Sequence, residues 1–541
     1  MSLQPSDDVY VPSKSVLVYP ETRQDVRANG EGVSQVVFHL APHLQFINPE
    51  NTRLRYEVVM EGRGQPVPSD VCGVHAFWRH QRVQTADGLN MLEEVDEMAS
   101  RVAMEWSYNS DETINNSRTL EQGLVLTSSN QNITFWNSQN TPTETITAGA
   151  VAKTIQINQE IYSGILGKQA DQVCPISAMG GVNLTLQTHN LKKCIQIKNK
   201  GGKNDANVGL VAKAVVVGDW NNASVNHAVD VEIKNGAVDG NTNPFVVGDK
   251  VYYDQAGVDT ELGLVKSVKI ANGNCAIEIT ANIAVNTNGP ALAIDDKIYV
   301  VQDDRFRGWT ASNANYGNDA QTVIAQAQAL VKVNYTLKNL EMNVELVMPA
   351  KSYVDRMTKA MMSGGFMMNY KQVNNYRVNV VGTQGNLNVS IPVGSEARRA
   401  YSLFVMPLNT IDTFDGNNLT CVGGDDVVNY QFVLNNQVIP DQLCRLEKLS
   451  LTPPRINQLA LSETRKGFVN IQVAVRNLQR PENNFVIARA LSAFGHTSNI
   501  SENDVSLRIE YGSNATRQKT MNCYLCSQRT LVIRNDGMEV M

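Results

Sequence analysis

One stretch of the sequence reads Ala329-Leu-Val-Lys-Val-Asn-Tyr-Thr-Leu-Lys-Asn-Leu-Glu-Met-Asn-Val-Glu-Leu-Val-Met348, and its side chains alternate between apolar and polar over most of that length. Successive side chains of a β-strand point to opposite faces of a sheet, so the stretch predicts one long strand with a buried and an exposed face. Thr52-Arg-Leu-Arg-Tyr-Glu-Val-Val-Met60 repeats the pattern, with Leu54, Tyr56 and Val58 on one side. Both stretches favour a protein built mainly of strands.

The composition supports a chain with many strands and turns. Of its 541 residues only 18% are charged, about one in ten is Asn, and 37 are Gly. Asn and Gly occupy tight turns and positive-φ positions, so we expect many short strands joined by turns. At roughly 100–200 residues per domain, the length predicts two to four domains.

The charge and hydropathy pattern argues against several classes of protein. Lys and Arg total 47 against 53 Asp and Glu, and a net charge of -6 without a basic block argues against nucleic-acid binding as the main role. No apolar run reaches the roughly 18 residues that a membrane-spanning helix requires. The polar, acidic start Met1-Ser-Leu-Gln-Pro-Ser-Asp-Asp8 predicts that there is no secretory signal peptide, and therefore that the thiols are reduced.

The sequence shows no arrangement of residues typical of catalysis or cofactor binding. Cys523-Tyr-Leu-Cys526 is an isolated CxxC motif in an expected strand, where positions i and i+3 face opposite sides, so we interpret both as packing cysteines rather than zinc or redox ligands. His75 and His80 also fall on opposite faces of an expected strand, which argues against a shared metal ion. The HExxH, GxSxG, Walker and GxGxxG motifs are absent. We therefore predict no catalytic, cofactor-binding or metal-binding residues.

The strand patterns fall into two groups. Residues 1–30 are polar and contain proline, and we expect them to form an extended N-terminal arm. Residues 31–365 hold the first group of strands and residues 366–541 the second. Each group runs through strands, a helix and further strands, which indicates an internal duplication of architecture. The expected helices are Leu92–Trp106, Ser352–Met362 and Ile456–Arg465.

Residues 198–325 interrupt the first group and have a different composition, rich in Gly, Asn, Asp and Val and poor in aromatic residues. Two segments in this region are alike, Val247-Gly-Asp-Lys-Val-Tyr-Tyr253 and Ile294-Asp-Asp-Lys-Ile-Tyr-Val300, and each is an acidic turn before a short strand. We interpret the acidic pairs as turn residues, because the ligand spacing of a Ca²⁺ loop is missing. The region predicts a small β-rich, barrel-like insertion.

Two eight-stranded jelly-roll sandwiches would use about 400 residues and leave room for the insertion and the arm. The predicted fold class is therefore all-β, with two consecutive eight-stranded jelly-roll β-sandwiches, short helices, and a small β-rich insertion in the first sandwich.

Several segments of the chain together carry a resemblance to a known family. They are Phe46-Ile-Asn-Pro-Glu-Asn-Thr-Arg-Leu-Arg-Tyr56, Gly73-Val-His-Ala-Phe-Trp-Arg-His-Gln-Arg-Val83 followed by Leu92-Glu-Glu-Val-Asp96, Pro175-Ile-Ser-Ala-Met-Gly-Gly-Val-Asn-Leu-Thr-Leu186, Tyr335-Thr-Leu-Lys-Asn-Leu-Glu-Met-Asn-Val344 and Tyr430-Gln-Phe-Val-Leu-Asn-Asn-Gln-Val-Ile-Pro440. In the same order, they resemble segments of the double jelly-roll major capsid proteins of virophages and polinton-like viruses. In the family's hairpin, Asn436 stands where Gly is usual, and Asn also tolerates the positive φ of such a turn. The resemblance covers about two thirds of the chain and leaves residues 198–325 outside it.

The resemblance implies a structural protein without a cofactor. It implies a homotrimer whose six barrels form a pseudo-hexameric capsomer, and capsomers that tile an icosahedral virion together with penton and minor capsid proteins. The insertion is expected to form a tower on the outer face, where it can contact the host surface. The protein is expected in the virion, after assembly in the cytoplasm or nucleus of the infected cell, with no sequence-specific contact to nucleic acid.

Two alternative functions remain open from the sequence, a β-sandwich carbohydrate-binding or receptor-attachment protein and a glycoside hydrolase. The carboxylates available to a hydrolase are Glu93, Glu94, Asp96 and Glu97. Glu93 and Glu97 lie four residues apart on the expected helix, which predicts a solvated or capping face. Aromatic residues make up only 6% of the chain, fewer than we expect in a hydrolase that binds sugars on aromatic platforms.

Overall fold

The computed structural model describes most of residues 11–541. No helix in the described part of the chain is long and apolar enough to cross a membrane. Gaps of up to four residues occur at several loops, and the longer undescribed stretches are 28–33, 110–120 except 114, 117 and 118, 124–152, 198–209, 217–225, 234–249, 282–296, 302–333, 411–426 except 419, 476–484 and 492–496.

The first sandwich contains two antiparallel sheets. One has the strand order β1-β17-β4-β8, with the short β2 (Val26–Arg27) beside β17, and the other has the order β3-β9-β6-β7. The two long alternating stretches of the sequence are neighbours, since β17 pairs with β4. The strands in chain order are β1 (Val11–Val18), β3 (Gln35–Leu40), β4 (Ile47–Glu61), β6 (Trp78–Thr85), β7 (Met91–Val95), β8 (Lys153–Glu160), β9 (Val182–Thr188) and β17 (Asn334–Met348).

The second sandwich repeats this arrangement. Its sheets have the orders β18-β26-β20-β24 and β19-β25-β21-β22, with β27 (Gly537–Val540) added beside β26 and β23 (Thr452–Ile456) beside β22. The principal strands are β18 (Phe366–Gly382), β19 (Asn386–Ile391), β20 (Ala400–Asn409), β21 (Val427–Leu434), β22 (Gln437–Leu449), β24 (Ile487–Ala490), β25 (Val505–Tyr511) and β26 (Arg517–Arg534).

The strand order identifies both sandwiches as jelly rolls. If the eight principal strands of each are numbered along the chain, one sheet contains strands 1-8-3-6 and the other contains strands 2-7-4-5, and this holds in both halves. Eight antiparallel strands exchanged between two sheets in this way make a jelly roll, in which each sheet covers the apolar face of the other. The predicted fold class is therefore confirmed. We call the two sheets of each roll the 1-8-3-6 sheet and the 2-7-4-5 sheet.

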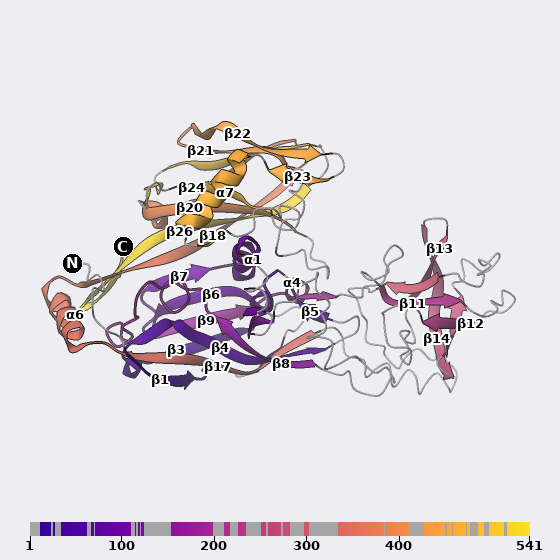
Figure 1. Ribbon diagram of the computed structural model, residues 1–541, viewed down its shortest axis with the longest axis horizontal. Helices are drawn as coiled ribbons and strands as arrows, with labels where there is room; N and C mark the ends of the chain where they lie inside the picture. Colours follow the sequence, from indigo (N-terminus) through magenta and orange to yellow (C-terminus); the bar gives the residue numbers. More distant parts are fainter. Residues whose placement is uncertain are drawn as a thin grey trace.

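Both rolls point in the same direction. Helix α6 (Lys351–Ser363) follows the last strand of the first roll and leads into the first strand of the second. The start of each first strand pairs with the end of the last strand of its roll, Val11 with Met348 and Phe366 with Ile533. Figure 1 shows α6 and the C-terminus at one end of the molecule, which we call the base.

The insertion lies between the seventh and eighth strands of the first roll, at the end opposite the base (Figure 1). Its strands close a barrel in the order β11-β12-β15-β14-β13-β16. The two similar segments of the sequence pair with each other, since Tyr252 lies opposite Tyr299, while their acidic turns lie outside the described residues. The strands are β11 (Leu210–Val216), β12 (Asn226–Ile233), β13 (Lys250–Gln255), β14 (Val258–Ala271), β15 (Asn274–Ala281) and β16 (Lys297–Val301).

Three expectations about elements are wrong. The expected strand that carries His75 and His80 begins as the 3-10 helix η2 (Val74–Phe77), which holds His75, and only Trp78–Thr85 forms the strand β6. Within the expected arm of residues 1–30, Val11–Val18 forms the edge strand β1, because β17 offers a free edge and the register shift after Pro12 accommodates the proline. The expected helix Leu92–Trp106 is the strand β7 followed by helix α1 (Met98–Tyr108). The other helices agree closely with the prediction, α6 (Lys351–Ser363) and α7 (Gln458–Asn470).

Candidate functional site: the junction between the two jelly rolls

An apolar cluster joins the 2-7-4-5 side of the first roll, including α1, to the 1-8-3-6 sheet and α7 of the second. Tyr108 of α1 stacks on Phe468 of α7, with ring centroids 4.6 Å apart. Small or polar interfaces let domains move relative to one another, whereas a large apolar interface fixes them. The cluster therefore makes the two rolls one rigid unit. Its buried members include Ala76, Val95, Met98, Ala99, Val102, Met104 and Trp106 from the first roll, and Phe404, Met406, Phe468, Tyr524 and Cys526 from the second.

The segment between β8 and β9 adds main-chain contacts to the junction. We call residues 161–172 the junction loop. A Cβ atom on Gly164 would lie only 2.0 Å from the carbonyl oxygen of Lys371 in β18, so only glycine fits at this position. Farther along the loop, Gln172 Nε2 donates a hydrogen bond to the carbonyl oxygen of Asn369, at 3.0 Å. The loop therefore rests directly on the backbone of β18.

Two tyrosines of the second roll donate hydrogen bonds to carbonyl oxygens of the first roll. The hydroxyl of Tyr370 donates to the carbonyl oxygen of Leu92 at 2.8 Å, and the hydroxyl of Tyr524 donates to that of Glu97 at 2.9 Å. Both tyrosines are buried, so each bond satisfies a polar group that burial would otherwise leave unpaired. The first bond holds β7 against β18, and the second holds the start of α1 against β26.

A group of charges closes the edge of the junction. Asp96 pairs with Arg79 at 3.1 Å and with Arg377 of β18 at 3.4 Å. Glu97 lies 3.3 Å from Arg377 and 3.2 Å from His189. Burial opposes ionisation of Glu97, but the hydrogen bond and charge of His189 and the nearby basic side chains outweigh it and lower the pKa to about 2. Arg377 thus ties the second roll to two carboxylates of the first.

The predicted solvated or capping face is wrong in its first part, because Glu93 and Glu97 are both buried, at 4% and 2% exposed, whereas Glu97 does occupy the N-cap position of α1. Glu93 lies in β7, and Glu97 has a positive φ of 51° immediately before α1. The Glu93 carboxylate accepts hydrogen bonds from the Ser163 hydroxyl and from the Gly164 main-chain nitrogen, the latter at 2.6 Å. Burial raises the pKa of Glu93 to about 7, although these bonds and the charge of Arg101 oppose the shift.

His75 belongs to a buried hydrogen-bond network. Its Nδ1 accepts a hydrogen bond from Gln159 Nε2 at 2.8 Å, so its Nε2 carries the proton and donates to Gln122 Oε1 at 2.6 Å. Gln159 Oε1 in turn accepts hydrogen bonds from the side chains of Tyr56 and Trp78. Burial lowers the pKa of His75 to about 4, so the ring is neutral at physiological pH.

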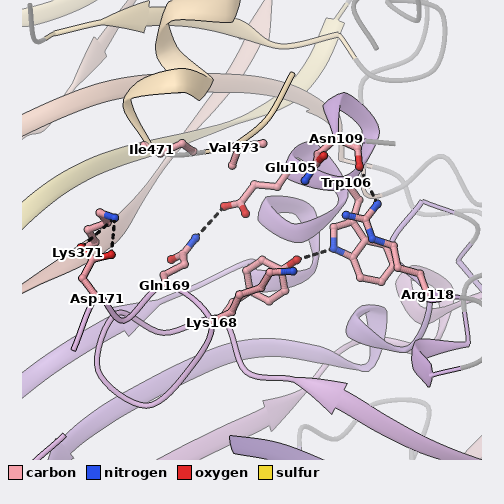
Figure 2. Close-up of a pocket in the computed structure, with 11 residues that line it drawn as sticks. Glu105, Trp106, Asn109, Arg118, Lys168, Gln169, Asp171, Lys371, Ile471 and Val473 are labelled. Atoms are coloured by element: carbon pink, nitrogen blue, oxygen red, sulfur yellow. Dashed lines mark hydrogen bonds and ion pairs between the residues drawn. The ribbon is translucent and has the colours of Figure 1, made fainter. Parts of the chain in front are cut away.

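A cavity of about 120 Å³ lies at the junction, lined by both rolls. Figure 2 shows Glu105 of α1 pointing towards Gln169 of the junction loop, and Lys371 of β18 paired with Asp171. Arg118 lies over the Trp106 ring at 4.4 Å. The pair Lys371–Asp171 therefore joins opposite charges of the two rolls at this cavity.

The other sequence candidates do not form a shared site. Glu94 is exposed and pairs with His80 at 3.0 Å, away from the buried Glu93. Cys523 and Cys526 are buried free thiols on opposite faces of β26, one in the core of the second roll and one in the junction, which confirms their interpretation as packing residues. Among the described residues, no group of three or more His, Cys, Asp or Glu side chains could hold a metal ion.

Sequence reasoning missed the junction, because its residues come from segments far apart in the chain. The local pattern closest to it is Leu92-Glu-Glu-Val-Asp96, which predicts the start of a helix and contributes Glu93 and Asp96 to the junction. Nothing in the sequence near Ser163 or Gly164 indicates their contacts with Glu93 and β18.

No protein-family model and no curated protein matches this chain in sequence. Its fold resembles solved structures of viral capsid proteins. The protein in the quasi-atomic model of the PBCV-1 virus capsid is 8% identical, with 100% of this chain and 98% of that chain covered and a TM-score of 0.49. The Faustovirus major capsid protein is 8% identical (98% and 92% covered, TM-score 0.44), and the mavirus major capsid protein is 9% identical (100% and 93% covered, TM-score 0.35).

Proposed function

We propose that the protein is a major capsid protein, a structural subunit that trimerises into pseudo-hexameric capsomers tiling an icosahedral virion. The observation that carries the proposal is the repetition of one complete jelly roll, with the same strand order and direction, twice in a single chain. A closed ring of three such chains holds six similar rolls, so a trimer can occupy a position with six neighbours. The resemblance of several sequence segments to double jelly-roll capsid proteins supports the same function.

The junction supports this role, because a shell subunit must keep its shape while its sides bind other subunits. The apolar cluster, the Gly164 contact and the Arg377 ion pairs leave the two rolls little freedom to rotate. The proposed role is structural rather than catalytic. Turnover of a glycan by the purified protein would contradict it.

The packing at the junction also suggests which surfaces of neighbouring chains contact each other. Within the chain, the 2-7-4-5 side of the first roll packs against the 1-8-3-6 sheet of the second. Repetition of the same packing around a ring brings the 2-7-4-5 sheet of the second roll against the 1-8-3-6 sheet of the first roll in the next chain. The outer faces of these two sheets are the contact surfaces that we propose for the trimer.

Both outer faces are polar, as subunit surfaces that meet after folding should be. On the second roll, Arg508 and Glu510 project from β25 beside a shallow groove of about 310 Å³. On the first roll, cross-strand positions carry opposite charges, such as Lys338 opposite Glu57 and Glu341 opposite Arg55. The amide side chains around the groove are Asn386, Asn388, Asn429 and Gln431.

The mass of the protein in solution tests the trimer. Light scattering should give three times the chain mass of 59.5 kDa, and negative-stain images should show three-fold particles with a hexagonal base. A monomer at high concentration without hexagonal particles would contradict the proposal.

Charge reversal tests the contact surfaces. Arg508→Glu places an acid on the proposed contact face and should shift the protein from trimer towards monomer. Arg398→Glu makes the same change at an exposed position near the base and should leave the trimer intact. If both variants remain trimeric, or both dissociate, the proposed faces are wrong.

The insertion barrel supports a second contact, with the host surface. It lies at the end of the molecule opposite α6, so it can project from a shell whose inner side is the base (Figure 1). In this proposal the protein resides in the virion, assembles inside the host cell, and also contacts penton and minor capsid proteins.

A further inference from the structure

Glu93 lies where β7, the junction loop and β18 meet. Its carboxylate binds Ser163 and Gly164 at the start of the junction loop, and the backbone of Gly164 rests on the carbonyl group of Lys371. The hydrogen bonds of Glu93 therefore hold the segment of the first roll that contacts β18 and so sets the spacing between the two rolls.

The hydrogen bonds around Glu93 suit only its ionised form. Ser163 Oγ already accepts hydrogen bonds from the main-chain nitrogens of Ile165 at 3.1 Å and Leu166 at 2.9 Å, so its own proton points to Glu93. The main-chain N–H of Gly164 points to the other carboxylate oxygen at 2.6 Å. Both partners of the carboxyl group are donors, so a proton on either oxygen of Glu93 would face another donor.

We propose that Glu93 is a proton-operated latch on the junction. As a carboxylate it holds the junction loop through both hydrogen bonds. When it takes up a proton, one of the two bonds breaks, and the start of the junction loop loosens from β7 and from its contact with Lys371.

Glu93 is the residue of this site that titrates at neutral pH, as the groups that face it indicate. Arg101 faces it from α1 and is itself bound to Glu105 at 3.1 Å. Cys174 faces it from the segment before β9, and Tyr370 faces it from β18. Burial raises the pKa of both the Cys174 thiol and the Tyr370 hydroxyl, so both stay neutral while Glu93 changes charge.

Protonation of Glu93 has opposite effects on the stability of the whole chain and on the order of the junction loop. The pKa of about 7 lies above the ordinary 4.5, so Glu93 contributes stability that is fully present below pH 4.5 and is lost as the pH rises through 7. The order of the loop changes the other way, since both hydrogen bonds require the carboxylate, whose fraction falls as the pH drops through about 7. A latch therefore differs from a simple buried acid, because protonation of Glu93 loosens the loop while Glu93's own contribution to the free energy of unfolding rises.

The latch is a property of the single chain. Its consequence for assembly rests on the proposed function, in which a loosened junction changes the angle between the two rolls of each capsomer. The order of the junction loop can be measured in the unassembled chain. The latch can therefore be tested separately from its consequence for assembly, whether or not trimers form.

Hydrogen–deuterium exchange of peptides covering residues 161–172 tests the latch directly. After correction for the intrinsic pH dependence of amide exchange, exchange in the full-length protein should become roughly tenfold faster as the pH falls through about 7, the change expected when one hydrogen bond to a charged group is lost. A loop whose corrected exchange is the same on both sides of pH 7 would overturn the proposal.

Two variants separate Glu93 from other groups. Glu93→Gln keeps the shape of the side chain but turns an amide donor towards Ser163 or Gly164, so the loop should exchange fast at every pH. Glu94→Gln changes the exposed neighbour on the same strand and should keep the wild-type pH step. A pH step that persists in Glu93→Gln would refute the assignment. If Glu93→Gln fails to fold, Ser163→Ala replaces it, because loss of this donor to the carboxylate should move the step to higher pH, and an unmoved step would equally refute it.

Discussion

Gly164 is the residue on which the spacing of the two rolls depends most directly. A Cβ added to Gly164 would lie 2.0 Å from Lys371 O. One added to Gly167 would lie 1.9 Å from Ile161 O in the same loop, so the junction loop is packed closely against β18 and against itself. We expect Gly164→Ala to force the loop away from β18 and to destabilise the protein by roughly 3 kcal/mol, the upper range for overpacking. Thermal unfolding checks this. Gly364→Ala is the matched control, because no atom lies within 4 Å of its added Cβ, and an equal loss in both variants would contradict the argument.

His75 should give the protein a pH dependence on the acid side. Its pKa of about 4 lies below the ordinary 6.5, so its contribution to stability is complete above pH 6.5 and is lost as the pH falls towards 4. Between pH 6.5 and 4, protonation of His75 changes the free energy of unfolding by up to about 1.4 kcal/mol per pH unit, the slope expected for one proton. His75→Gln keeps a donor and an acceptor for Gln122 and Gln159, so the variant should be less stable at pH 7.5. It should also lose the His75 contribution to the slope, which opposes that of Glu93 between pH 4.5 and 7.

Denaturation curves between pH 7.5 and 4 measure this slope. His43→Gln, at an exposed position, serves as the control and should keep the wild-type slope. If the free energy of unfolding of His75→Gln has the same pH dependence as that of the wild type, protonation of His75 does not drive the loss of stability.

At the scale of elements, the alternating patterns predicted strands well, and the residues of α1 show where local patterns fail. Leu92, Val95, Met98, Ala99, Val102 and Trp106 fit one helical stripe, yet the chain forms β7 up to Val95 and α1 only from Met98. The pairing of β7 with β6, for example Gln81 with Val95, replaces the first helical turn. Sheet partners lie outside any local window, so the sequence could not predict that Glu93 is in a strand and buried.

The β21–β22 hairpin shows the opposite case, a turn that its own residues determine. Asn435 and Asn436 have φ angles of 48° and 64°, as a two-residue type I′ turn requires, so the hairpin predicted from the sequence is confirmed. Asn436→Gly should therefore leave stability unchanged or raise it slightly. Asn436→Ala should cost about 1 kcal/mol, because alanine has no side chain to offset the left-handed conformation. Thermal unfolding compares the two variants, and an alanine variant as stable as the glycine variant would contradict this account.

For the whole molecule, the duplication could be predicted from the order of strands and helices, but the arrangement of the rolls could not. The first and eighth strands of the first roll, β1 and β17, pair across more than three hundred residues that include the insertion. Nothing local to Val11–Val18 indicates this partner, which is why the segment was expected to be part of an arm. The junction depends on the same kind of long-range contact, since Arg377 and Asp96 meet only after both rolls have formed.

The insertion barrel should be separable from the rest of the molecule. Its six described strands pair only with one another, so no sheet hydrogen bond among the described residues ties the barrel to either roll. Replacement of residues 198–333 by a flexible Gly/Ser linker of about twelve residues should therefore preserve the thermal transition of the two rolls and the proposed trimer. If the barrel contacts the host, the same variant should lose attachment to host cells. Light scattering and a cell-binding assay measure these outcomes separately. Aggregation or loss of the trimer would show that the barrel stabilises the rolls, and attachment at the wild-type level would show that another surface binds the host.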